Sequence, residues 1–135
     1  MSRLDETRPF IPVRIAVLTV SDTRALADDK SGDLLASRLT EAGHALAERA
    51  IVHDDKAQII AALRTFIQTP DIDCVISTGG TGLTGRDVTP EAFRAVFEKE
   101  IDGFGEIFRF LSFQKIGTST LQSRAVAGVA GGTYL

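Results

Sequence analysis

The chain has 135 residues, of which 44% are apolar and 24% are charged, a composition typical of one globular domain. A net charge of −3 gives no basic surface to collect phosphate backbones, so we expect no nucleic-acid partner. No apolar run approaches the roughly 20 residues that a membrane helix needs, so we expect no membrane association. The single cysteine, Cys74, excludes an internal disulfide, and together with two distant histidines it makes no zinc site. We therefore expect a cytoplasmic protein.

The first half of the chain alternates predicted strands and helices after a tail of residues 1–12. The β-branched run from Val13 to Val20 predicts a strand covered on both faces. A helix is expected from Asp33 to Glu41, where leucines recur at helical spacing. The less hydrophobic run from His44 to Val52 predicts a strand nearer the sheet edge.

A second helix is expected to reach Gln68, with Asp54 as its N-cap. The run from Cys74 to Ile76 then predicts a buried strand, in which Cys74 is interpreted as a core thiol.

The most informative stretch runs from Ser77 to Glu91 and contains four glycines within seven residues. Glycine has no Cβ, so such a loop brings backbone N–H groups close to an anion. Asp87, at the far end of the loop, adds a hard oxygen ligand of the kind that Mg²⁺ prefers. Thr89, Pro90 and Glu91 then predict a helix start, with a hydroxyl cap followed by proline and an acid. This pattern favours a phosphate-binding role over a plain turn.

The last third of the chain predicts two helical segments and a hairpin. Phe104, Ile107, Phe108 and Leu111 form a stripe that we interpret as core or subunit interface. Residues 125–130 predict a strand, Gly131–Gly132 a tight turn, and residues 133–135 a short return strand. Because strands usually have about five or six residues, we expect the domain, residues 13–135, to lack a C-terminal part.

Helices that separate the predicted strands indicate an α/β fold with a mainly parallel sheet covered on both faces, to which the closing hairpin adds antiparallel pairing. Ligands bind such sheets beyond the carboxyl ends of the strands. Ser21 and Asp22 follow the first strand, so they are either ligand contacts or simply a polar loop that closes the strand.

Residues 80–85 match the dinucleotide fingerprint G-x-G-x-x-G, but we interpret the match as accidental. In that fold the third glycine lies inside the helix that begins at the loop, whereas four residues separate Gly85 from Pro90. The match also follows the third strand and not the first. A Walker A loop is excluded, since the chain contains no Gly-Lys-Ser or Gly-Lys-Thr.

The run Thr78-Gly79-Gly80-Thr81-Gly82, followed by Arg86-Asp87-Val88-Thr89-Pro90-Glu91-Ala92, resembles the molybdopterin-binding domain of molybdenum-cofactor biosynthesis. The resemblance extends from about Val13 to Leu135. The segments 103–106 and 117–128 look most like the B-protein branch of that family. The resemblance implies a three-layer α/β/α fold, assembled as a homotrimer or a dimer of trimers.

The resemblance also implies a reaction, in which Mg-ATP adenylylates the terminal phosphate of molybdopterin. ATP and molybdopterin would be the substrates and Mg²⁺ the metal. Asp54 and Asp87 correspond to the two functional carboxylates of the family, with Asp87 as the Mg²⁺ ligand. The expected molybdopterin- and nucleotide-binding residues are Ser21, Asp22, Thr78, Gly79, Gly80, Thr81, Gly82, Glu91, Ser119, Ser123 and Arg124.

Two hypotheses stay open at this point. The chain is either a molybdopterin adenylyltransferase or a protein of the same pathway that binds molybdopterin or nucleotide without turnover. Aspartate at both carboxylate positions favours the enzyme, and the B-type sequence around Ser119 favours binding alone. A dinucleotide oxidoreductase is a distant third hypothesis.

Overall fold

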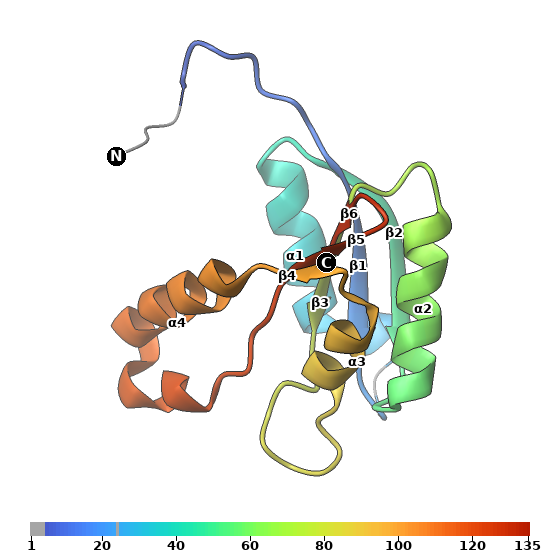
Figure 1. Ribbon diagram of the computed structural model, residues 1–135, viewed down its shortest axis with the longest axis vertical. Helices are drawn as coiled ribbons and strands as arrows, with labels where there is room; N and C mark the ends of the chain where they lie inside the picture. The colour runs from blue at the N-terminus through green and yellow to red at the C-terminus, as the bar shows by residue number, and fades with distance from the viewer. Residues whose placement is uncertain (1–4, 24) are drawn as a thin grey trace.

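The computed structural model describes residues 5–23 and 25–135, which form one mixed sheet with helices on both faces (Figure 1). The strands are β1 (Arg14–Val20), β2 (Ala45–Val52), β3 (Cys74–Thr78), β4 (Lys99–Glu100), β5 (Gly128–Ala130) and β6 (Thr133–Tyr134). Their order across the sheet is β2-β1-β3-β6-β5-β4. Strands β2, β1, β3 and β6 pair in parallel, whereas β4, β5 and β6 pair antiparallel. The predicted mainly parallel sheet with an antiparallel hairpin is confirmed.

The helices are α1 (Lys30–Glu41), α2 (Lys56–Gln68), α3 (Thr89–Val96) and α4 (Asp102–Ile116), with short 3-10 helices η1 (Leu26–Asp28) and η2 (Gly117–Gln122). Figure 1 shows α1 on one face of the sheet and α2 with α3 on the other, which makes three layers. Helix α4 and η2 extend away from this body. No helix within the described residues is long and apolar enough to cross a membrane.

Strand β1 supplies the centre of the core because its alternate side chains point to opposite faces. Ile15 and Val17 pack with Leu39 of α1. The other side of β1 contributes to a larger cluster with α2 and α3, which includes Ala16, Leu18, Val20, Ile59, Leu63, Phe66, Ala92, Phe93 and Val96. Six of the seven residues of β1 are buried, as predicted for a strand covered on both faces. Strand β2 lies at the edge of the sheet, which confirms that the less hydrophobic second strand is nearer the edge than β1.

The predicted start of α1 at Asp33 was wrong, because the helix begins at Lys30 with Asp29 as its N-cap. The Asp29 carboxylate accepts hydrogen bonds from the Gly32 N–H at 3.0 Å and from Thr19 Oγ1 at 2.7 Å. Arg49 on β2 pairs with the same carboxylate at 3.1 Å. Asp29 is thus both N-cap and buried ion-pair partner.

Two other predicted caps lie one residue away from the observed ones. Asp55, and not Asp54, is the N-cap of α2, and its carboxylate accepts from the Gln58 N–H. Helix α3 already begins at Thr89, and its N-cap residue, Val88, makes no side-chain hydrogen bond to the helix. The Thr89 hydroxyl donates instead to a carbonyl of the glycine loop, that of Gly79.

The C-terminal hairpin is present, but its first strand is shorter than predicted. Strand β5 begins at Gly128 rather than at residue 125. Gly131 and Gly132 form the turn with φ of +56° and +82°, as the sequence predicted. The aromatic stripe of α4 is exposed, including Phe104 and Phe108, so it is not part of the core of this chain.

Candidate functional site

The carboxyl ends of β1, β2 and β3 meet at one edge of the sheet because the three strands are parallel. The Ser21 N–H, just after β1, donates to the carbonyl of Val52 at the end of β2 at 2.8 Å. The Asp54 N–H donates to Oδ1 of Asp22 at 3.0 Å. The predicted residues Ser21, Asp22 and Asp54 are therefore brought together at this edge.

The glycine loop that follows β3 lies directly against these groups. Gly79 has φ of +97°, and a Cβ added there would lie 2.1 Å from the Val20 carbonyl oxygen. Gly80 has φ of +69°, and its added Cβ would lie 2.3 Å from Oγ1 of Thr89 and 3.0 Å from Oδ1 of Asp54. Both the backbone angle and the space require glycine at these two positions.

Thr89 fixes the direction of the loop's first peptide groups. Its Oγ1 donates to the Gly79 carbonyl at 2.9 Å, and its N–H donates to the Gly80 carbonyl at 3.1 Å. In a trans peptide the next N–H points opposite to the carbonyl, so the N–H groups of Gly80 and Thr81 point away from Thr89. Among the described residues, none accepts a hydrogen bond from these two groups. The loop thus offers donors to an anion beside the N-terminus of α3.

Two aspartates at this edge have opposite pKa shifts. Burial raises the pKa of Asp54, and the negative charges of Asp22 and Asp87 raise it further. Hydrogen bonds from Arg86, whose Nε lies 3.2 Å from Oδ2, and from the Asp54 N–H lower the pKa of Asp22. The charge of Asp22 is therefore neutralised by Arg86. Asp54 borders the loop as a carboxylate whose negative charge is disfavoured by burial and by the neighbouring acids.

Asp87 remains ionised because Thr84 supports its charged form. The Thr84 hydroxyl and N–H donate to Oδ2 of Asp87 at 2.6 and 3.0 Å, and these bonds lower the pKa of Asp87. Within the described residues, no three acidic, histidine or cysteine side chains are grouped to hold a metal ion. Mg²⁺ is usually held by one or two carboxylates, waters and substrate phosphates. Asp87 fits that pattern, with substrate oxygens as further ligands.

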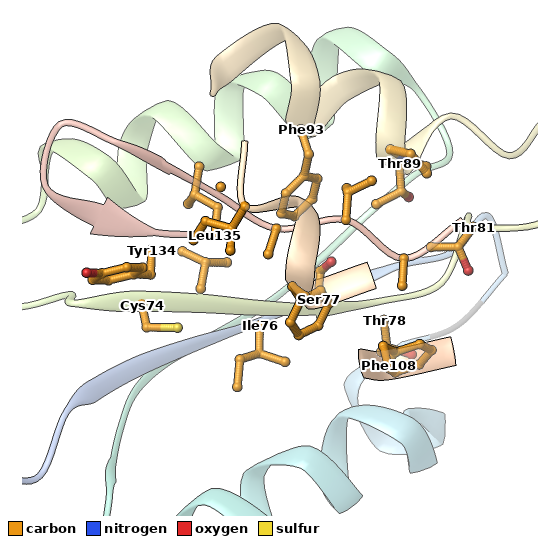
Figure 2. A pocket seen from close by; sticks show the side chains of 18 of the residues that line it. Cys74, Ile76, Ser77, Thr78, Thr81, Thr89, Phe93, Phe108, Tyr134 and Leu135 are labelled. Carbon is orange, nitrogen blue, oxygen red and sulfur yellow. The ribbon is translucent and has the colours of Figure 1, made fainter. Parts of the chain in front are cut away.

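A cavity of about 630 Å³ adjoins the loop and is mostly lined by apolar side chains of β3, α3, α4 and residues 123–128. Figure 2 shows Thr78, Thr81 and Thr89 at one end of it and Tyr134 with Leu135 at the other. Small-molecule sites have volumes of about 300–1,000 Å³. A ligand with an apolar body and an anionic end matches this arrangement.

The predicted residues from the second half of the chain occupy different places. Ser123 lines the cavity, whereas Ser119 is exposed on η2. Arg124 contacts the loop, where its Nε donates to the Gly82 carbonyl at 2.7 Å. Its Nη1 pairs with Glu91 of α3 at 2.6 Å, so these two predicted residues are partners.

Sequence reasoning missed two residues of this edge, Thr84 and Arg86, and it missed the loop-anchoring role of Thr89. A cation adjacent to Asp87 inside a loop of small residues was a usable signal for Arg86. The backbone bonds of Thr89 had no such signal, since a threonine before Pro-Glu looks like an ordinary helix cap.

Comparison with known proteins identifies the family to which the chain belongs. The family described as "Probable molybdopterin binding domain" matches residues 16–133. The chain belongs to this family. It is 52% identical over 126 residues to molybdenum cofactor biosynthesis protein B of Escherichia coli K12, which covers 93% of this chain and 74% of that protein. This identity confirms the resemblance to the B-protein branch.

Two solved structures agree with the fold. A crystal structure of molybdenum cofactor biosynthesis protein B has a TM-score of 0.90 and 45% identity, covering 94% of this chain and 80% of that one. A structure of MogA has a TM-score of 0.79 and 31% identity, covering 90% and 80%. The chain is a B-type protein of molybdenum-cofactor biosynthesis.

Proposed function

We propose that this chain binds molybdopterin and Mg-ATP at the carboxyl edge of its sheet and adenylylates the terminal phosphate of molybdopterin. The observation that carries the proposal is the glycine loop, in which Thr89 directs the N–H groups of Gly80 and Thr81 away from itself. The carboxylate of Asp54 lies beside Gly80 and that of Asp87 beside Gly82, and the apolar cavity adjoins the loop. These are the groups that an anionic ligand with a ring system needs.

In the proposed reaction a phosphate oxygen of molybdopterin forms a bond to the α-phosphorus of ATP. The bond from that phosphorus to the bridging oxygen of the β-phosphate breaks, and pyrophosphate leaves. Both reactants are anions, so the site must neutralise the charge of the approaching phosphoryl groups. The N–H groups of Gly80 and Thr81 do so as preorganised donors.

The carboxylates divide the remaining work. Asp87 would hold Mg²⁺, which when bound would shield the phosphate charges and orient the pyrophosphate leaving group. Asp54 would co-ligate it or position the nucleotide. The proposed binding residues are among those predicted above, namely Ser21, Asp22, Thr78, Gly79, Gly80, Thr81, Gly82, Ser119 and Ser123. Glu91 and Arg124 contribute by holding the loop, since they pair with each other and Arg124 donates to the Gly82 carbonyl.

A binding protein without turnover is the second candidate, and one observation favours it. Oδ2 of Asp87 already accepts two hydrogen bonds from Thr84, so this oxygen is engaged by the protein itself. A site of this kind would bind the phosphate through the loop alone.

Pyrophosphate release from molybdopterin and Mg-ATP separates the two candidates. We expect the unmodified chain to release pyrophosphate and Asp87→Asn to lose at least about 100-fold of the rate. Asp71→Asn is the matched control, because Asp71 is exposed and precedes the other end of β3. Molybdopterin binding without pyrophosphate release would select the binding protein. No binding of molybdopterin would reject both.

We also propose that the chain forms a homotrimer, alone or as a dimer of trimers, with α4 in the contact. The support is a set of exposed apolar side chains on α4, such as Ile107 and Phe110, at 60% and 62% exposure. Contiguous apolar patches of this kind mark interaction sites. Light scattering should give a smaller assembly for Ile107→Glu with Phe110→Glu, and an unchanged one for Arg64→Glu, because Arg64 is exposed on α2 and lies outside the α4 patch. A monomeric unmodified chain would contradict the proposal.

A further inference from the structure

Arg124 joins the segment before β5 to both ends of the second half of the glycine loop. Its Nε donates to the Gly82 carbonyl at 2.7 Å, and its Nη2 donates to the Asp87 carbonyl, also at 2.7 Å. Its Nη1 pairs with both carboxylate oxygens of Glu91, at 2.6 and 3.0 Å. All three guanidinium nitrogens are therefore engaged with protein groups, and the side chain is only 29% exposed.

The two carbonyl contacts decide where the following N–H groups point. Because a trans peptide places the N–H opposite to the carbonyl, holding the Gly82 carbonyl turns the Leu83 N–H away from Arg124. Holding the Asp87 carbonyl turns the Val88 N–H away in the same manner. Among the described residues, none accepts a hydrogen bond from either N–H. Arg124 thus does for the second half of the loop what Thr89 does for the first half.

Only arginine has the geometry for this role. A guanidinium offers five N–H donors in a rigid planar fork, whereas a lysine ammonium is a compact point charge on a flexible stem. Glu91 lies in the first turn of α3, so the ion pair holds the guanidinium of Arg124 in one orientation relative to that helix. Lysine at position 124 would keep the charge but could not hold two carbonyls and a carboxylate in these directions.

We propose that Arg124 is a positioning residue, which holds the loop between Gly82 and Asp87 so that its N–H groups face the phosphate, and that it does not itself bind the phosphate. The proposal rests on the proposed function, since it concerns the same loop. It gives Arg124 an indirect role, in place of the direct one expected when it was counted among the molybdopterin- and nucleotide-binding residues.

The first test compares Mg-ATP binding by calorimetry for the unmodified chain, Arg124→Lys and Arg124→Gln. Positioning by the fork predicts that both variants bind about tenfold more weakly or worse, because each loses charge-assisted hydrogen bonds. Arg94→Gln is the matched control, since Arg94 pairs with Glu100 at the surface and should bind as the unmodified chain does. Near-normal binding by Arg124→Lys, together with weak binding by Arg124→Gln, would show a direct charge contact and overturn the proposal. Normal binding by both would overturn it as well.

Glu91→Gln tests the orientation of the fork without removing Arg124. We expect weaker Mg-ATP binding than in the unmodified chain, and no additional loss when Glu91→Gln is combined with Arg124→Gln, because residues that act as one unit are not additive. Additive losses would mean that Glu91 and Arg124 act separately, which contradicts the proposal.

Amide hydrogen exchange in the ligand-free protein separates this proposal from the proposed function. The Asp87 N–H donates to the Thr84 carbonyl at 3.1 Å within the segment that Arg124 holds. We expect this amide to exchange faster in Arg124→Lys and to be unchanged in Arg94→Gln. Unchanged exchange in Arg124→Lys overturns the positioning role whether or not ATP binds. Faster exchange in a chain that binds no Mg-ATP would uphold the loop-holding role and reject the proposed function.

Discussion

Arg86 of the glycine loop is bonded to Asp22 at the end of β1, with both its Nε and its Nη2 donating to Oδ2 of Asp22. Oδ1 of the same carboxylate accepts the Asp54 N–H, so one side chain connects the segments after β1, β2 and β3. The loop is therefore fixed to the sheet by a contact between residues 64 positions apart.

Removing this contact should make stability depend less on pH. Arg86 lowers the pKa of Asp22, so the stabilisation is present above the ordinary aspartate pKa of about 3.9 and is lost as the pH falls through the lowered value. We expect Asp22→Asn to lower the urea midpoint at pH 7, and this difference from the unmodified chain to shrink as the pH falls through the lowered Asp22 pKa. Arg86→Gln should add little to Asp22→Asn, because the two share one ion pair. A difference that stays constant with pH would contradict this explanation.

Asp54 should show the opposite behaviour. Burial and the charges of Asp22 and Asp87 raise its pKa, so the folded state is favoured by protonation below the ordinary aspartate pKa and loses that advantage as the pH rises through the raised value. We expect Asp54→Asn to be more stable than the unmodified chain at pH 7, with the gain shrinking toward pH 3. Thermal unfolding across this pH range checks the sign. Lower stability of Asp54→Asn at pH 7 would show that the carboxylate has a stabilising partner.

The glycines of the loop should differ sharply in their tolerance of a side chain. Gly79→Ala places a Cβ against the Val20 carbonyl at a positive φ, and we expect a loss of about 1–3 kcal/mol in unfolding free energy. Gly85→Ala is the matched control, because an added Cβ meets no described atom within 4 Å and φ is not positive. Denaturant unfolding measures both. Equal losses in the two variants would mean that the loop is not held as described.

The place of the candidate site residues in the fold could largely be predicted, because parallel strands bring their carboxyl ends to one edge. That rule placed Asp22 and the glycine loop together from the alternation of strands and helices alone. The helix caps were less accessible, since Asp54 and Asp55 are adjacent and only the backbone geometry selects Asp55. Contacts such as that of Arg124 with Gly82 join residues 42 positions apart, and no local pattern encodes them.

The exposed stripe of α4 marks another limit of sequence reasoning. Apolar residues at helical spacing predict a buried face, and the pattern is the same whether the core or another subunit covers it. Phe104 and Phe108 stack with ring centroids 5.9 Å apart, yet each is 44% exposed in this chain.

The most direct measurement is a titration of the ¹⁵N-labelled chain with Mg-ATP, followed through backbone amide resonances. We expect saturable shifts at Gly80, Thr81 and Leu83, with the resonances of Gly103 and Gly132, which lie outside the loop, unchanged. If ATP shifts other amides while those of the loop stay in place, or if no shift saturates, then the loop does not bind phosphoryl groups and the account is wrong.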